Sequence, residues 1–173
     1  RNRSSREQDY NIVGLTSASN KAFVEGLGCY DTVLTYDELD QLDASVPTAT
    51  VDFAGNGDVL GQLHTHLNDN LTYSCLVGAS HWDQRGGMPE NLPGPAPQLF
   101  FAPSQAEKRL KEWGGAEFQR RVAEVWLEFV GFVDGWIEFS YGHGSDALIP
   151  VYQDVLAGKF DPKAGYILSL WDE

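Results

Sequence analysis

The histidines are the residues of this sequence that most readily carry acid–base chemistry. Imidazole gains and loses a proton near neutral pH, and a nearby carboxylate can orient the ring and stabilise its charged form. His81 stands close to Asp83, and His143 stands close to Asp146. We expect His81 with Asp83 to be the better catalytic pair, because they follow the carboxyl end of a predicted strand, where ligands bind in parallel sheets. The alternative is that each histidine is structural or exposed.

Metal and nucleophilic chemistry have less support. His64 and His66 are two positions apart in a predicted helix, so they point to different faces and no metal site is expected. Cys29 and Cys75 have no adjacent base that would activate a thiol, and we expect both to be small buried residues. The absence of a G-x-S-x-G motif leaves hydrolase chemistry without support.

Short apolar runs alternate with helical segments in the first half of the chain. The predicted strands are 12–15, 32–35, 49–53 and 71–78, separated by a helix that ends near Gly28, a helical turn over 37–43, and a helix that begins near Asp58 as its cap and carries Leu60, Leu63 and Leu67. Alternating strands and helices with short loops predict an α/β fold, with a mostly parallel sheet covered by helices on both faces.

The second half begins with a segment that breaks this alternation. Residues 81–98 hold four prolines and Arg85-Gly86-Gly87, which predicts an exposed loop ordered by Trp82, or alternatively a functional lid. Further elements are then predicted: a strand at 99–102, helices from Ser104 through Val133, a strand at 136–139, a helix that begins near Pro150, and a strand at 166–170.

The charge of the chain limits its partners. With a formal net charge of −13 it repels nucleic acid and anionic membranes, so neither is expected as a partner. No apolar run approaches the roughly 20 residues that a membrane span requires, and no signal-peptide pattern is present. These observations favour a cytoplasmic protein. A small anionic cofactor remains possible, because a few local cations act at short range.

Several stretches of the sequence resemble known families. GLTSASNKAFVEGLGCYD, VDFAGNG, YSCLVGASHWD and LFFAPSQ are similar to the DUF2855 group, and the similarity covers essentially the whole chain. The block from Asn11 to Leu39 also resembles the second strand, helix and third strand of medium-chain dehydrogenase/reductases of the quinone oxidoreductase type. This resemblance implies a Rossmann-like cofactor-binding domain with an NAD(P)-dependent oxidoreductase activity on an unidentified small molecule.

The resemblance also implies a site for the 2′-phosphate of NADP(H). It places Thr16, Ser17, Lys21 and Tyr36 around that phosphate, where hydroxyls and one cation can hold it. No acidic residue ends the strand before Ser17, and an acidic residue there would normally bind the ribose of NAD(H), so NADP(H) is favoured over NAD(H). The alternatives are a solvated cation at Lys21, helix capping by Ser17 or Ser19, and a partly buried anchor at Tyr36.

Three further residues are implied to approach the cofactor. Gly55 and Asn56 follow the third predicted strand, and Gly78 follows the fourth. Glycine permits a close approach of backbone to ligand, although the same glycines could simply form tight turns.

One departure from the reductase pattern bears on the whole prediction. No G-x-G-x-x-G run precedes Ile12, and in a 3-2-1-4-5-6 sheet the missing first strand lies between the strands at 12–15 and 49–53. We therefore expect residues 1–173 to be the C-terminal portion of a single Rossmann-like domain plus a helix and strand extension, with an N-terminal segment of the same protein, or another chain, completing the sheet.

The resulting functional prediction has two branches. The first is an NADP-preferring reductase domain without a metal, inactive as an isolated fragment. The second is a non-catalytic binding or assembly module that retains the fold, as the missing fingerprint would allow. A homodimer, formed by extending a sheet through the aromatic segment Trp136–Phe139, is also possible under the resemblance.

Overall fold

The computed structural model of the protein describes residues 10–78, 91–159 and 161–171. The chain divides into two compact units, residues 1–100 and residues 101–173, and we describe each by itself. Every strand pairing that the structure describes within the two units is parallel. The prediction of an α/β fold with parallel strands and intervening helices is therefore confirmed, and the architecture is consistent with a Rossmann-like fold.

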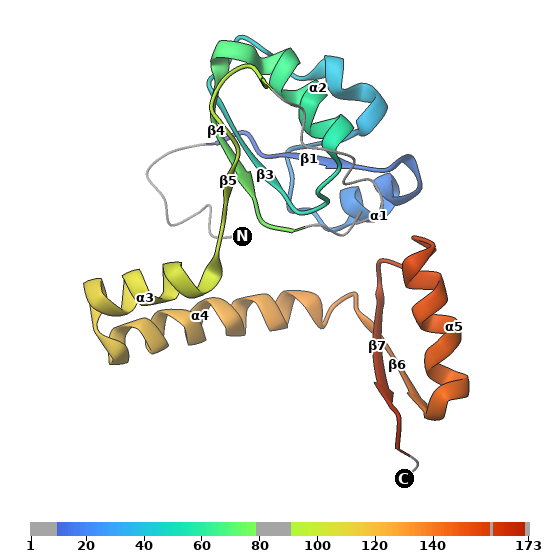
Figure 1. The fold of residues 1–173 in the computed structure, drawn as a ribbon. Coiled ribbons are helices and arrows are strands. Elements are labelled where there is room, and N and C mark those ends of the chain that lie inside the picture. The colour runs from blue at the N-terminus through green and yellow to red at the C-terminus, as the bar shows by residue number, and fades with distance from the viewer. Residues whose placement is uncertain (1–9, 79–90, 160, 172–173) are drawn as a thin grey trace. The chain divides into compact units, whose positions relative to one another are not determined.

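The first unit contains five strands and two α-helices among its described residues (Figure 1). In chain order they are β1 Val13–Thr16, 3-10 helix η2 Ala18–Asn20, α1 Lys21–Gly26, β2 Thr32–Thr35, 3-10 helix η3 Tyr36–Gln41, β3 Thr48–Asp52, α2 Gly57–Leu67, 3-10 helix η4 Asn68–Asn70, β4 Leu71–Leu76 and β5 Gln98–Leu99. The strands and helices of this unit agree with the predicted ones to within about two residues at most ends, as expected for strongly patterned segments.

The strands of this unit form two sheets rather than one. β1 pairs with β2, and β3, β4 and β5 form a second sheet in that order. Among the described residues no ladder joins β1 to β3, so the strands that carry Val13 and Val51 are not paired neighbours. The strand order implied by the resemblance to reductases predicts this separation. Each of these two strands consequently keeps one edge that pairs with no described strand.

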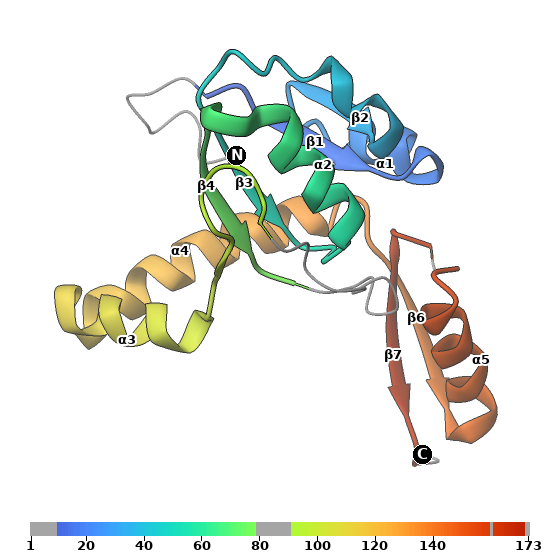
Figure 2. The ribbon, with the colours of Figure 1, turned by 45° about the horizontal axis from the view of Figure 1, so that its top comes forward.

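One hydrophobic core nevertheless connects the two sheets. Leu39 of η3, Leu63 and Leu67 of α2 and Leu71 of β4 are buried together, and Leu15 of β1 packs against them. Burying a leucine side chain contributes roughly 1.5–3 kcal/mol, so this cluster stabilises the unit. The core packs α2 against both sheets, and Figure 2 shows the course of the α2 ribbon in this unit.

The second unit contains a helical hairpin followed by a β-α-β segment. Its elements are α3 Ala102–Trp113, α4 Gly115–Val133, β6 Glu138–His143, α5 Gly144–Leu156 and β7 Ala164–Ser169. Gly114, at φ 78°, turns the chain between α3 and α4, a conformation that glycine adopts without steric cost. β6 and β7 pair in parallel over their whole lengths, from Glu138 with Ala164 to His143 with Ser169.

The strand predicted at 99–102 is limited to β5, because Ala102 already begins α3. Within the second unit, the first strand and the last helix differ most from the prediction. The strand predicted at 136–139 starts only at Glu138, because the backbone N–H groups of Trp136 and Ile137 still donate to Val133 at the end of α4. The helix predicted to begin near Pro150 begins at Gly144, so Pro150 lies inside α5. Proline is a helix-start signal in a sequence, but the apolar positions before Pro150 extend the helix towards the N-terminus.

The side chains of the second unit are largely exposed. None of its described helices has a buried residue, and Val122, Val125 and Phe129 on α4 are each at least half exposed. The predicted apolar stripe of α4 therefore exists, but no described residue of this unit buries it. Among the described helices, none has the length and apolar character that crossing a membrane requires.

Candidate functional site

The carboxyl ends of β1 and β2 lie side by side and bring the predicted phosphate residues to one edge. Thr16 is directly opposite Thr35 in the parallel register, and both side chains are buried. Ser17 therefore leaves β1 next to the point where Tyr36 leaves β2. This follows from parallel pairing, in which strand ends of the same polarity meet at the same edge of the sheet.

Ser17 precedes the helical segment in extended conformation but makes no capping hydrogen bond. Its hydroxyl instead lies 2.9 Å from the hydroxyl of Ser19, and both groups are near the surface. The predicted capping by a serine hydroxyl is therefore not observed. A hydroxyl pair that bonds mainly to itself can exchange that bond for one to a ligand, since each oxygen can both donate and accept.

Lys21 at the start of α1 forms an ion pair that the sequence prediction missed. Its Nζ lies 2.7 Å from Oε2 of Glu38, and the two side chains are 30% and 33% exposed. The interpretation of Lys21 as a freely solvated cation is therefore wrong. The ammonium is present at the predicted edge, but a carboxylate already holds it.

Glu38 is fixed in place by a second hydrogen bond. The backbone N–H of Thr35 donates to the same Oε2 at 2.9 Å, as part of a capping box at the start of η3. The hydrogen bond from Lys21, followed by the one from Thr35, holds the pKa of Glu38 below its ordinary value of 4.5. The Thr-x-x-Glu pattern from Thr35 to Glu38 was the signal that could have located this carboxylate in the sequence.

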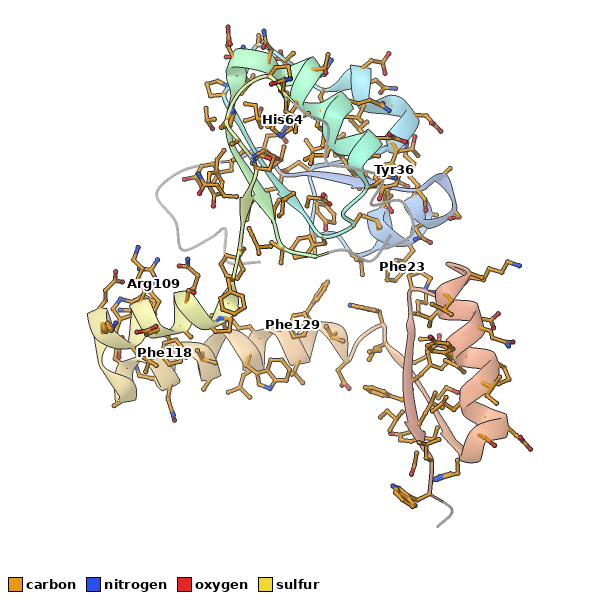
Figure 3. All side chains as sticks on the ribbon, viewed as in Figure 1. Phe23, Tyr36, His64, Arg109, Phe118 and Phe129 are labelled. Carbon is orange, nitrogen blue, oxygen red and sulfur yellow. The ribbon has the colours of Figure 1, made fainter. Side chains whose placement is uncertain are left out.

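Tyr36, labelled in Figure 3, follows the end of β2 and senses the charge of Asp52 at the end of β3. The tyrosine is half-buried, and burial, followed by the nearby charge of Asp52, raises its pKa. Asp52 in turn accepts hydrogen bonds from the backbone N–H groups of Ala54 and Gly55 at 2.8 and 3.0 Å. The interpretation of Tyr36 as a partly buried anchor fits these surroundings, and Asp52 is a neighbour that the sequence prediction did not include.

Gly55 and Asn56 form the turn between β3 and α2. Gly55 has φ 71°, and the side-chain oxygen of Asn56 accepts from the backbone N–H groups of Asp58 and Val59 at 3.0 and 3.2 Å. Asn56 is therefore the N-cap of α2, and the prediction that Asp58 caps this helix is wrong. Both residues lie after the carboxyl end of β3, where they were expected.

Gly78 lies after β4 and contacts the protein's own backbone. A Cβ atom at this position would be 2.4 Å from the carbonyl oxygen of Phe53, and the N–H of Gly78 donates to the carbonyl of Asp52 at 3.2 Å. The backbone of Gly78 closely approaches the segment after β3, whereas its predicted approach to a cofactor stays a prediction. Glycine is required here because any side chain would overlap that carbonyl.

The histidines of α2 have separate structural roles. His64 is fully buried, with Nδ1 2.8 Å from the carbonyl oxygen of Pro93 and Nε2 2.9 Å from the hydroxyl of Ser74. His66 bonds instead to the carbonyl of Leu42 at 2.8 Å. The two rings therefore face different partners, as predicted, and no cluster of metal-ligating residues occurs within the described ranges.

The predicted acid–base pairs receive no geometric support. His81 and Asp83, with Trp82 between them, lie outside the described residues, as does most of the 81–98 loop. Nδ1 of His143 lies 3.4 Å from the carbonyl oxygen of Trp171, and among the described residues no hydrogen bond or ion pair joins His143 to Asp146. Both cysteines are free thiols, Cys75 buried and Cys29 only partly so.

Comparison with known proteins identifies the family. No curated protein and no solved structure matches the chain. Residues 1–161 match the family described as protein of unknown function (DUF2855), which covers most of both units. The chain therefore belongs to the DUF2855 family.

Proposed function

We propose that residues 1–100 are the nucleotide-binding part of an NAD(P)-dependent oxidoreductase related to medium-chain reductases, with NADP(H) preferred over NAD(H). One observation supports this best. The carboxyl ends of β1 and β2 adjoin, and Thr16, Ser17, Lys21 and Tyr36 lie at or just after these two ends. Nucleotides bind at that edge of doubly wound sheets. The substrate would be a small molecule that accepts or gives a hydride.

The side chains at this edge have the chemical groups that bind a phosphate-bearing ribose. Hydroxyls of Ser17 and Ser19 can donate to phosphate oxygens, and Lys21 supplies a positive charge. Thr16 stands where an acidic residue would favour the free ribose hydroxyls of NAD(H). The bound cofactor would supply the hydride chemistry, while these residues would bind and orient its adenosine end.

The same proposal includes a further β-strand between β1 and β3. Both strands have one edge that pairs with no described strand, and Val51 on β3 is 56% exposed. The hydroxyl of Thr50 is buried and has no hydrogen-bond partner among the described residues. An unpaired edge exposes a row of backbone N–H and C=O groups. An additional strand, from the same polypeptide or another chain, would pair with these edges and bring the turn that holds the pyrophosphate.

Calorimetric titration of the full-length protein with NADPH and NADH tests the proposal. We expect NADPH to bind more tightly, and Lys21→Met to weaken NADPH binding by about fivefold while NADH binding stays the same, as for the loss of one charge contact. Lys111→Met is the matched control, because Lys111 forms a comparable 2.6 Å pair with Glu107 on α3. Absence of binding for both dinucleotides would contradict the proposal.

A second candidate function is a non-catalytic binding or assembly module. It is favoured by the exposed apolar side chains of α4 and of β6 and β7, which include Phe129, Phe139 and Tyr141. Large exposed apolar patches commonly mark protein interfaces, and a homodimer is one form this could take. Turnover of NADPH with any quinone, enone or aldehyde would exclude this candidate, and sedimentation showing only monomer would exclude the homodimer.

A further inference from the structure

We propose that Glu38 is a specificity-determining residue of the nucleotide site. Its carboxylate offsets the positive charge of Lys21 and so reduces the preference for a ribose 2′-phosphate. The inference rests on the proposed function, because it concerns the same edge of the β1–β2 sheet. It goes further in assigning a role to a residue that the family resemblance did not indicate. The preference for NADP(H) over NAD(H) would then be set by two opposed charges.

The position of the carboxylate supports this assignment. Oε2 of Glu38 lies 2.7 Å from Nζ of Lys21 and also accepts the backbone N–H of Thr35 at 2.9 Å. The bond to the backbone holds the carboxylate at the carboxyl end of β2, so it cannot simply turn away when a ligand arrives. Lys21 has a long flexible stem and can reorient, whereas Glu38 stays.

The charges then determine the direction of the effect. A phosphate monoester carries about 1.5 to 2 negative charges at neutral pH. A phosphate oxygen that contacts Lys21 in its paired position comes near the carboxylate of Glu38, and like charges at such distances repel. The free ribose hydroxyls of NAD(H) are neutral donors, which a carboxylate can accept. Glu38 should therefore disfavour the phosphate and tolerate the diol.

The two hydrogen bonds of Glu38 allow its charge to be separated from its structural role. In Glu38→Gln the amide oxygen still accepts from the N–H of Thr35, so the cap at η3 is retained. Only the negative charge is removed. Glu107→Gln is the matched control, because Glu107 forms a similar ion pair with Lys111 on the exposed surface of α3.

The experiment measures calorimetric binding of 2′,5′-ADP and 5′-AMP to the full-length wild-type protein and to Glu38→Gln, Lys21→Met and Glu107→Gln. We expect Glu38→Gln to bind 2′,5′-ADP about fivefold more tightly, the change associated with one partly exposed charge. Binding of 5′-AMP should stay within about twofold of wild type, as for a contact that carries no charge. Glu107→Gln should match wild type for both probes, and thermal unfolding confirms that each variant is folded.

The outcomes distinguish this inference from the proposed function. An unchanged or reduced preference for 2′,5′-ADP in Glu38→Gln, together with weaker 2′,5′-ADP binding in Lys21→Met, overturns the role of Glu38 and leaves the proposed function intact. Failure of the wild-type protein and of Glu38→Gln to bind either probe overturns both. A higher preference for 2′,5′-ADP in Glu38→Gln than in wild type supports both.

Discussion

Nε2 of His64 lies 2.9 Å from the hydroxyl of Ser74, inside the first unit and out of contact with solvent. The carbonyl of Pro93 can only accept, so Nδ1 of His64 donates to it. The imidazole ring thus joins α2, β4 and the segment at Pro93.

Replacing His64 with alanine should destabilise the protein strongly. The change removes two hydrogen bonds, leaves the buried Ser74 hydroxyl and the Pro93 carbonyl without these partners, and opens a cavity. Together these effects should lower the free energy of unfolding by about 3 kcal/mol. Urea denaturation measures this loss. His66→Ala serves as the comparison, because His66 is only half-buried and makes one bond, to Leu42. Equal losses in the two variants would contradict this account.

Gly78 should not tolerate a side chain. In Gly78→Ala the new Cβ would be 2.4 Å from the carbonyl oxygen of Phe53, and the resulting shift should cost about 2–3 kcal/mol of stability. Gly26→Ala is the control, since a Cβ at the end of α1 would meet nothing within 4 Å. That substitution should be neutral or stabilise by about 0.5 kcal/mol. Thermal unfolding of both variants provides the test, and a harmless Gly78→Ala would refute the tight approach.

The ion pair of Glu38 should make stability depend on pH in a defined direction. The pKa of Glu38 is lower in the folded protein than its ordinary value of 4.5, so the charged carboxylate stabilises the fold above that pH. This contribution should disappear as the pH falls from 4.5 through the lowered pKa. Wild type should therefore exceed Glu38→Gln in stability at pH 7, with the difference vanishing in acid.

Urea denaturation of both proteins, repeated at intervals of about one pH unit between pH 3 and pH 7, measures this difference in the free energy of unfolding. Lys21→Met provides the control background. In that background the Glu38→Gln substitution should have a smaller effect, because the hydrogen bond from Lys21 is the largest cause of the lowered pKa. A difference between wild type and Glu38→Gln that persists unchanged at low pH would count against the ion pair.

The environment of Tyr36 can be tested through its phenol. Burial raises the pKa of Tyr36 first, and the charge of Asp52 raises it further. In Asp52→Asn the side-chain oxygen can still accept from Ala54 and Gly55, but the charge is gone. The pKa of Tyr36 should therefore move down towards 10. NMR of ring-labelled tyrosines at alkaline pH reports it, with Tyr36→Phe assigning the signal, and an unmoved or higher pKa would show that Asp52 does not act on it.

Some of the site could be predicted from the sequence because it depends on local pattern. The strand over 32–35 and the turn at Gly55 follow from apolar runs and turn residues, which act over a few positions. Parallel pairing then requires Thr16 and Thr35 to share an edge. The Thr35-x-x-Glu38 pattern is equally local and predicts the capping box, but only the structure shows that Lys21 pairs with this carboxylate.

The sequence by itself determined which segments are strands and helices and that the strands run parallel, because periodicity and connection length act along the chain. The resemblance to reductases added the prediction that β1 and β3 are not direct partners. Only the tertiary structure decided that Lys21 is held by Glu38, 17 positions away, and that Gly78 accommodates the backbone of Phe53. Such contacts depend on how side chains meet after the sheet has formed, and no spacing rule relates residues that pair across separate elements.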